Sequence, residues 1–325
     1  MPACLGAAAS RFCYETLARG GAGMEKVRRT DNTVRGVILT LVGGTCWGFS
    51  GTCAKFLMDA YAVDPIWLVC VRQLCSSVLF IALAAAVPAD RERLSKLVRT
   101  RAGGIMGAGA LVLTALCMML NSTSYVVTID LTNSATATVL QTLGIAVLMV
   151  FACVGARRLP RRREAVGLAL ALAGTFMLAT GGDPTRLSMP PAGLAWGIVC
   201  GISYALYTAV PHESLRLWGS PVVNGVAMLV SGVILAVAIR PWEHVPSFDA
   251  VGLAWLAIIV FVGTFLAFAL YLQGVKDLGP LRASMLGTSE PIAATVFSVL
   301  WLGTMFTGAD LAGFAMIIAT VYLTA

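Results

Sequence analysis

Apolar stretches of about 20 residues alternate with short polar loops along almost the whole of this chain. A helix needs about 20 apolar residues to cross ~30 Å of hydrocarbon, so each stretch has the length of a transmembrane helix. The pattern predicts ten such helices, over residues 36–57, 65–86, 103–121, 130–154, 164–182, 192–210, 221–240, 250–272, 280–302 and 307–325. We therefore expect an all-α polytopic membrane protein.

The basic residues give the orientation that we expect for these helices. Of the 23 lysine and arginine residues, 19 lie in the N-terminal arm or in loops on one side of the predicted bundle. Arg186 and Arg240 lie in loops on the opposite side, and Lys55 and Arg72 lie within predicted helices. Loops rich in Lys and Arg stay in the cytoplasm. We predict a multi-pass protein of the cell (inner) membrane with both termini cytoplasmic.

The chain divides into an arm and two similar halves. The first 24 residues contain no apolar core long enough for a signal peptide. We predict a disordered cytoplasmic arm over residues 1–33, a first five-helix repeat over 34–183 and a second over 190–325. The matched positions are Gly36, Gly44 and Trp47 with Gly193, Gly201 and Tyr204, Pro65 with Pro221, and Gly167 with Gly313. Because each half has an odd number of spans, the two repeats are inverted, an arrangement that places a binding site near mid-membrane.

Composition supports a membrane protein and excludes several other classes. The chain is 58% hydrophobic and 12% charged, whereas a soluble domain carries about 25% charged residues. The net charge of +7 does not indicate nucleic-acid binding, because the basic residues are divided among loops that flank the spans. The cysteines have no metal-like spacing and both histidines lie in loops, so we expect no metal site. No motif indicates a cofactor.

Three stretches resemble one family of transporters. The first span contains Gly44-Thr45-Cys46-Trp47-Gly48, the second begins with Pro65 and contains Arg72, and residues 278–302 combine small residues, Pro291 and an aliphatic helix. These features resemble the EamA-type permeases of the drug/metabolite transporter superfamily, over residues 34–325. The first half has no proline at 139–145, where the second half has Pro291. We therefore expect span four to be straighter than span nine.

Glu290 is the first candidate for a functional residue. It lies near the middle of predicted span nine, one residue before Pro291, which we expect to break the helix. An ionisable side chain at that depth is costly and is usually kept for a function. Ala283, Gly287 and Ala294 share its helical face and leave room beside it. We interpret Glu290 as a cation or proton site; the alternative is a structural acid bonded to a neighbouring helix.

Arg72 is the second candidate. It lies seven residues into span two, about 10 Å below the outer boundary of the membrane at 1.5 Å per residue. A guanidinium at this depth can face a water-filled cavity and bind a carboxylate or phosphate. It can also extend toward the outer surface or pair with Asp130, which we expect to open span four. Lys55 lies nearer the outer end of span one, where we expect it to reach the surface beside Asp59.

Polar and aromatic side chains on other spans are further candidates for the wall of a central cavity. Tyr204 and Tyr207 lie too deep for interface anchors alone, and the amide of Gln141 needs either a solute or a helix as its partner. Gly44, Gly48 and Gly51 of span one either flank the cavity or allow close helix packing, and we favour close packing. The full set of candidate residues for binding or coupling is Glu290, Arg72, Gln141, Trp47, Tyr204, Tyr207, Ser203, Thr138 and Tyr271.

The resemblance implies a secondary transporter that works by alternating access and exports small polar metabolites, such as amino acids or related compounds. Its partners would be the solute, the lipid bilayer, protons bound at Glu290, and a second copy in a homodimer. An exchanger of phosphorylated or nucleotide-linked solutes is the alternative, although it needs more basic residues in the cavity than Arg72 and Lys55. A membrane scaffold or enzyme is the non-transport alternative. No set of catalytic groups converges at one depth, so we expect no enzyme.

Overall fold

The structure is a computed structural model, and it describes residues 32–99, 105–155, 157–183, 185, 187–210, 212–278, 283 and 286–324. Most of the predicted arm therefore lies outside the described residues. Its last two residues, 32 and 33, already belong to the first helix.

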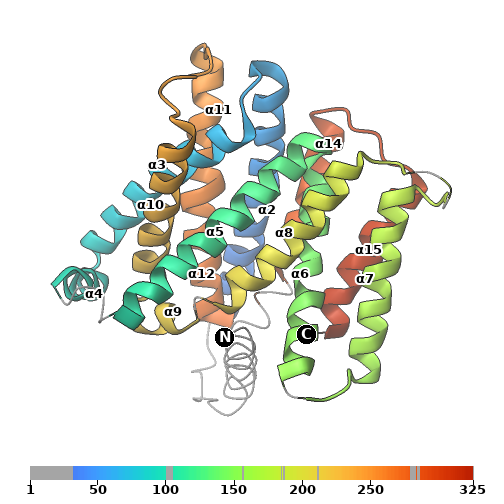
Figure 1. Ribbon diagram of the computed structural model, residues 1–325, viewed down its shortest axis with the longest axis horizontal. Coiled ribbons are helices and arrows are strands. Elements are labelled where there is room, and N and C mark those ends of the chain that lie inside the picture. Colours follow the sequence, from blue (N-terminus) through green and yellow to red (C-terminus); the bar gives the residue numbers. More distant parts are fainter. Residues whose placement is uncertain are drawn as a thin grey trace.

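Every regular element of the described part is a helix (Figure 1). The first half contains α2 (Asn32–Tyr61), α3 (Pro65–Ala86), α4 (Pro88–Arg99), α5 (Ile105–Leu131), α6 (Ser134–Gly155) and α7 (Arg162–Thr180). The second half contains α8 (Pro191–Ala209), α9 (His212–Trp218), α10 (Ser220–Ile239), α11 (Ala250–Val260), the π-helix η1 (Phe261–Leu266), α12 (Ala267–Leu278), α14 (Ser289–Leu300) and α15 (Gly308–Thr324).

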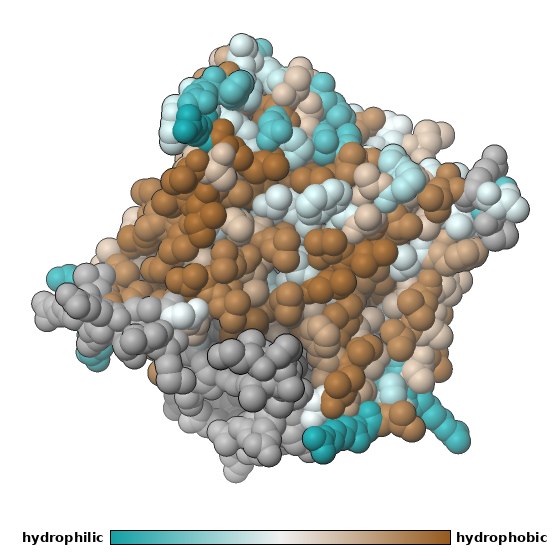
Figure 2. Space-filling model, viewed as in Figure 1, coloured by the Kyte–Doolittle hydropathy of each residue, from teal (hydrophilic) through white to brown (hydrophobic). Residues whose placement is uncertain are grey.

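The helices have the length and composition of membrane spans. Eight of the described helices are long and apolar enough to cross a bilayer, with α11, η1 and α12 forming one continuous span. The apolar helices α14 and α15 are shorter and take the places of the ninth and tenth predicted spans. On the face shown in Figure 2, apolar side chains form a broad band across the molecule, and polar side chains gather at its upper and lower ends. The prediction of an all-α polytopic membrane protein is confirmed.

Local signals in the sequence explain where several helices begin and end. Asp64 caps α3 by accepting hydrogen bonds from the backbone N–H groups of Ile66 and Trp67, at 2.8 and 2.9 Å. Asp249 caps α11 through the N–H of Gly252, and the Tyr61 hydroxyl donates to the same carboxylate at 2.7 Å. These hydrogen bonds stabilise the charged form and lower the pKa of Asp249.

Two predicted boundaries in the first half are wrong. The third span does not end at residue 121, because α5 continues to Leu131. Asp130 therefore lies at the end of α5 and does not open the fourth span, which begins at Ser134. The run Asn121–Ser124 looks like a loop in the sequence, yet Ser124 is buried and its hydroxyl lies 3.1 Å from that of Ser203 on α8. Interhelical hydrogen bonds satisfy polar groups that would otherwise favour a loop.

The two halves pack as an inverted pair. The helix α3 packs on α10, and α7 packs on α15, so each of these pairs joins equivalent helices of the two halves. The helix α2 packs on α12 and α14, and its counterpart α8 packs in the same way on α5 and α6 (Figure 1). A two-fold axis in the membrane plane exchanges these contacts, as expected for inverted repeats.

Close helix crossings show which residues of the two halves are equivalent. A Cβ at Gly48 would meet the Glu290 carbonyl and the Ala294 backbone nitrogen. In the other half, a Cβ at Gly201 would meet the Leu140 carbonyl and the Gly144 backbone nitrogen. Gly201 therefore corresponds to Gly48, one helical turn from the predicted match with Gly44.

The crossing of the last helix of each half corrects a second match. A Cβ at Gly174 of α7 would meet the Gly313 carbonyl, and a Cβ at Gly313 of α15 would meet the Gly174 carbonyl. Gly313 is therefore the counterpart of Gly174 and not of Gly167. Small residues at these crossings let the backbones approach closely.

Candidate functional site

A break in the ninth span positions Glu290. The helix α14 begins at Ser289, so Glu290 lies in its first helical turn. Pro291 follows in the same turn, where a backbone N–H would have no partner within the helix. The Glu290 N–H donates to the Gly287 carbonyl at 3.0 Å. The predicted break is present, but it precedes Pro291 by several residues. In contrast, α6 is continuous from Ser134 to Gly155, as expected for a span without proline.

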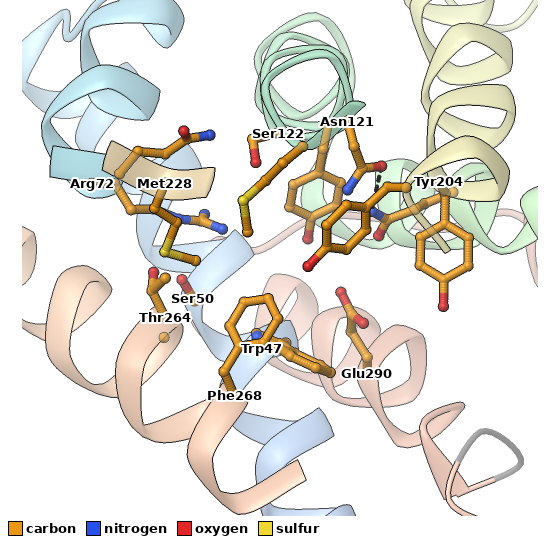
Figure 3. A pocket seen from close by; sticks show the side chains of 16 residues that line it. Trp47, Ser50, Arg72, Asn121, Ser122, Tyr204, Met228, Thr264, Phe268 and Glu290 are labelled. Atoms are coloured by element: carbon orange, nitrogen blue, oxygen red, sulfur yellow. Dashed lines mark hydrogen bonds between the residues drawn. The ribbon is translucent and has the colours of Figure 1, made fainter. Parts of the chain in front are cut away.

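A cavity of about 120 Å³ lies between the two halves, next to this break. Its wall combines charged, polar and aromatic side chains from α2, α3, α5, α6, α8, α10, the η1 region and α14 (Figure 3). The lining residues are Trp47, Ser50, Arg72, Gln73, Met118, Asn121, Ser122, Tyr125, Gln141, Tyr204, Tyr207, Met228, Gly263, Thr264, Phe268 and Glu290. The volume is sufficient for several water molecules or a small solute.

Arg72 and Glu290 lie on opposite walls of this cavity (Figure 3). Within the described part of the chain, no ion pair or hydrogen bond joins either side chain to another group. The two charges interact electrostatically across the space between them. The N-terminus of α14 adds positive potential near the Glu290 carboxylate. The cavity therefore has a cationic end and an anionic end.

The other intramembrane cation is not part of this site. The Lys55 ammonium lies 2.9 Å from the Asp59 carboxylate and donates to the Asp130 carbonyl at 2.9 Å. Lys55 therefore lies beside Asp59, as expected, with a side chain that is 17% exposed. The carbonyl of Asp130 thus bonds to Lys55, and Arg72 faces the cavity instead of pairing with Asp130.

A smaller cavity of about 40 Å³ continues from the anionic end. It shares Gln141, Tyr204 and Glu290 with the larger cavity and adds Thr138 and Pro291 to the lining. The Gln141 amide donates to the Asn121 side-chain oxygen at 3.3 Å, so it has a partner on a neighbouring helix and also lines both cavities. Glu290 and Gln141 therefore connect the two spaces.

Comparison with known proteins gives the family. The model of the EamA-like transporter family matches the chain twice, over residues 34–180 and 191–325. The chain belongs to the EamA-like transporter family. Each match covers one of the two inverted halves, and membership identifies the protein as a membrane transporter and not an enzyme. Arg72 comes from the first EamA-like half and Glu290 from the second, so the cavity needs both.

Similar proteins from bacteria are transporters by name. The chain is 30% identical to the uncharacterized inner membrane transporter YicL of Salmonella typhimurium, over 90% of this chain and 95% of YicL. It is 22% identical to an uncharacterized transporter of Clostridium kluyveri, over 83% of this chain and 86% of that protein. A solved crystal structure with 16% identity aligns with a TM-score of 0.58 over 90% of this chain and 95% of that chain. This last likeness concerns the fold alone.

Most of the candidate residues named from the sequence line one of the two cavities of this EamA-like protein. Two do not. The Ser203 hydroxyl is buried behind the wall, where it donates to the Cys200 carbonyl at 2.9 Å. The Tyr271 ring lies outside both linings and packs on Trp47, with ring centroids 5.0 Å apart. Both residues thus contact the wall from outside.

Several lining residues were not predicted. Asn121 and Tyr125 were missed because the third span was ended too early, and Ser50 and Gln73 because single polar residues in apolar helices carry no pattern. Gly263 was also missed, whereas its neighbour Thr264 was expected to flank the cavity with Phe268 and Tyr271. Both belong to η1, where the Thr264 hydroxyl donates to the Ile259 carbonyl, five residues earlier, at 3.0 Å. Short π-helical segments often occur at functional sites. The described residues contain no cluster of His, Cys, Asp and Glu able to hold a metal ion.

Proposed function

We propose that this EamA-like transporter carries small zwitterionic metabolites, such as amino acids, through the central cavity. The observation that carries the proposal is the position of Arg72 and Glu290 on opposite walls, each without an ion-pair partner in the described part of the chain. A guanidinium binds a carboxylate with two parallel hydrogen bonds, and a carboxylate binds an ammonium group. A zwitterion supplies both groups and neutralises both charges at once.

The charge of the cavity disfavours the exchange of phosphorylated solutes. A phosphate monoester carries about two negative charges at neutral pH. Arg72 is the one basic residue among those that line the two described cavities, and Lys55 is engaged by Asp59 and Asp130. Glu290 on the facing wall would repel such a solute.

Alternating access is supported by contacts at the predicted outer end of the bundle. The Ser134 hydroxyl lies 3.0 Å from that of Thr52 and 2.9 Å from that of Ser298, so a buried chain of three hydroxyls joins α2, α6 and α14. This chain links the two halves on the outer side of the cavity. We propose that it separates when the cavity opens to the outside, and that it re-forms when the cavity faces the cytoplasm.

Glu290 is the proposed site of proton coupling. Its carboxyl faces both cavities and can bind either a proton or the ammonium group of the solute. Proton binding and solute binding would then exclude one another, so an inward proton gradient would drive solute out of the cell. The proposed location is the inner membrane, in keeping with the description of YicL, with both termini in the cytoplasm.

A metabolite comparison tests this function. Cells that overproduce the protein are compared with cells that overproduce the Arg72→Met variant, and intracellular and medium pools are measured by mass spectrometry. Zwitterionic amines should move from the cell to the medium with the wild-type protein alone. Accumulation of phosphorylated solutes in the medium, with unchanged amino-acid pools, would overturn the proposal.

A further inference from the structure

Three uncharged residues at the cationic end of the cavity have buried polar atoms without partners. Both amide atoms of Gln73 and the hydroxyls of Tyr125 and Ser50 have no hydrogen-bond partner in the described part of the chain. The exposed fractions of these residues are 3%, 7% and 2%. All three line the larger cavity. Buried polar groups are almost always hydrogen-bonded, so such a cluster calls for an explanation.

The three side chains come from three different helices. Gln73 follows Arg72 on α3, and Tyr125 on α5 interacts electrostatically with both Arg72 and Glu290. The Tyr125 hydroxyl lies 2.8 Å from the Cβ position of Gly51, which follows Ser50 on α2. The Ser50 side chain in turn abuts Gly263 of η1. Four helical segments therefore bring these polar groups to one end of the cavity.

The hydrogen-bonding capacity of this end matches a carboxylate. A carboxylate accepts about four hydrogen bonds, and the guanidinium fork of Arg72 can supply two. The Gln73 amide and the Tyr125 and Ser50 hydroxyls can supply the rest. We infer that Gln73, Tyr125 and Ser50 complete, with Arg72, a carboxylate subsite that fixes the orientation of the solute. This inference rests on the proposed function and adds the residues that recognise the acidic group.

A ligand pair separates this role from a structural one. Neutral amino acids and the amines that lack their carboxylate, such as alanine with ethylamine and phenylalanine with phenethylamine, are tested as inhibitors of flux in proteoliposomes. Gln73→Leu and Tyr125→Phe should weaken inhibition by the amino acids about 10-fold to 100-fold, as expected for a hydrogen bond to a charged group. Inhibition by the amines should stay within about 2-fold of the wild-type value.

A matched control comes from the same helix as Tyr125. The Thr123 hydroxyl is also buried without a partner in the described part of the chain, but Thr123 is not among the residues that line the cavities. Thr123→Val should leave inhibition by both members of each pair unchanged. Gln73→Leu should not lower the thermal denaturation midpoint, because the amide has no protein partner to lose.

The outcomes distinguish this inference from the proposed function. If wild-type protein binds neither amino acids nor amines, both are wrong. If wild-type protein binds amino acids but Gln73→Leu weakens amino acid and amine equally, or weakens neither, then only the carboxylate subsite is wrong. In that case the three residues contact water alone.

Discussion

Two charged residues determine the chemistry of the cavity, and each has a different local environment. Arg72 belongs to the continuous helix α3 and is followed by Gln73. Glu290 lies at the start of α14, just after a break in the helical structure of the ninth span. The structural counterpart of Glu290 in the first half is Leu140. The inverted repeat is therefore symmetric in packing and asymmetric in charge, so one carboxylate serves the site.

The proton-coupling role of Glu290 gives the first prediction. Glu290→Gln keeps the size and polarity of the side chain but removes its ability to take up and release a proton. Solute exchange by this variant should lose its dependence on pH across the range in which wild-type exchange varies, because no other change is made to the site. The measurement is counterflow of a radiolabelled amino acid in proteoliposomes at matched internal and external pH. A variant with the wild-type pH profile would remove the coupling role.

At the residue scale, the sequence identifies Arg72 and Glu290 as candidate site residues, because ionisable groups in apolar helices are rare. It does not identify Gln73 or Ser50, because uncharged polar residues are common in membrane spans and their burial depends on neighbouring helices. Ser203 and Tyr271 show the reverse error. Neither side chain lines a cavity, because the Ser203 hydroxyl bonds to Ser124 and the Tyr271 ring packs on Trp47.

At the scale of elements, close crossings determine how the helices pack. Gly48 of α2 lies against the backbone of α14 at Glu290 and Ala294, so a side chain there would push the two helices apart. Because α14 positions Glu290, this crossing connects packing directly to the cavity.

A single methyl group tests this crossing. Gly48→Ala should lower the unfolding free energy by about 1–3 kcal/mol, as overpacking does in tightly packed interiors. Gly109→Ala is the control, because nothing lies within 4 Å of the Cβ position of Gly109 in α5. The measurement is the thermal denaturation midpoint in detergent. Equal midpoints for the two variants would show that α2 and α14 are not in close contact at Gly48.

At the scale of elements, hydropathy predicts the existence of the spans better than their ends. The third span was too short by ten residues because Asn121–Ser124 is polar, although α8 provides partners for that run. The helices α4 and α9 were missed because they are short and polar, and they lie against one another beside the membrane spans. The π-helix η1 was missed because its extra residue per turn leaves no trace in the pattern of apolar residues.

The whole molecule is an inverted pair, and the basic loops predict its orientation in the membrane. Leu159 and Met305 lie in loops at opposite ends of the bundle, with exposed fractions of 88% and 91%. Single cysteines at these two positions should be labelled from opposite sides of the membrane. A maleimide that cannot cross the membrane should react from outside with Met305→Cys and not with Leu159→Cys.

Two details make this labelling decisive. The two positions are almost equally exposed, so a difference in reaction reports sidedness and not burial. The unsubstituted protein gives the background from the native cysteines. Labelling of Leu159→Cys from outside would invert the topology and, with it, the proposed direction of transport.

The most direct test of the central claim is the flux of three matched solutes through wild-type, Arg72→Met and Glu290→Gln proteins in proteoliposomes. The solutes are a neutral amino acid, the amine without its carboxylate and the acid without its amino group. Wild-type protein should carry the amino acid faster than either of the other solutes. The Arg72→Met variant should lose the preference for the amino acid over the amine. The Glu290→Gln variant should lose the preference for the amino acid over the acid. Wild-type flux of the amine or of the acid that equals or exceeds amino-acid flux would contradict a cavity built for zwitterions.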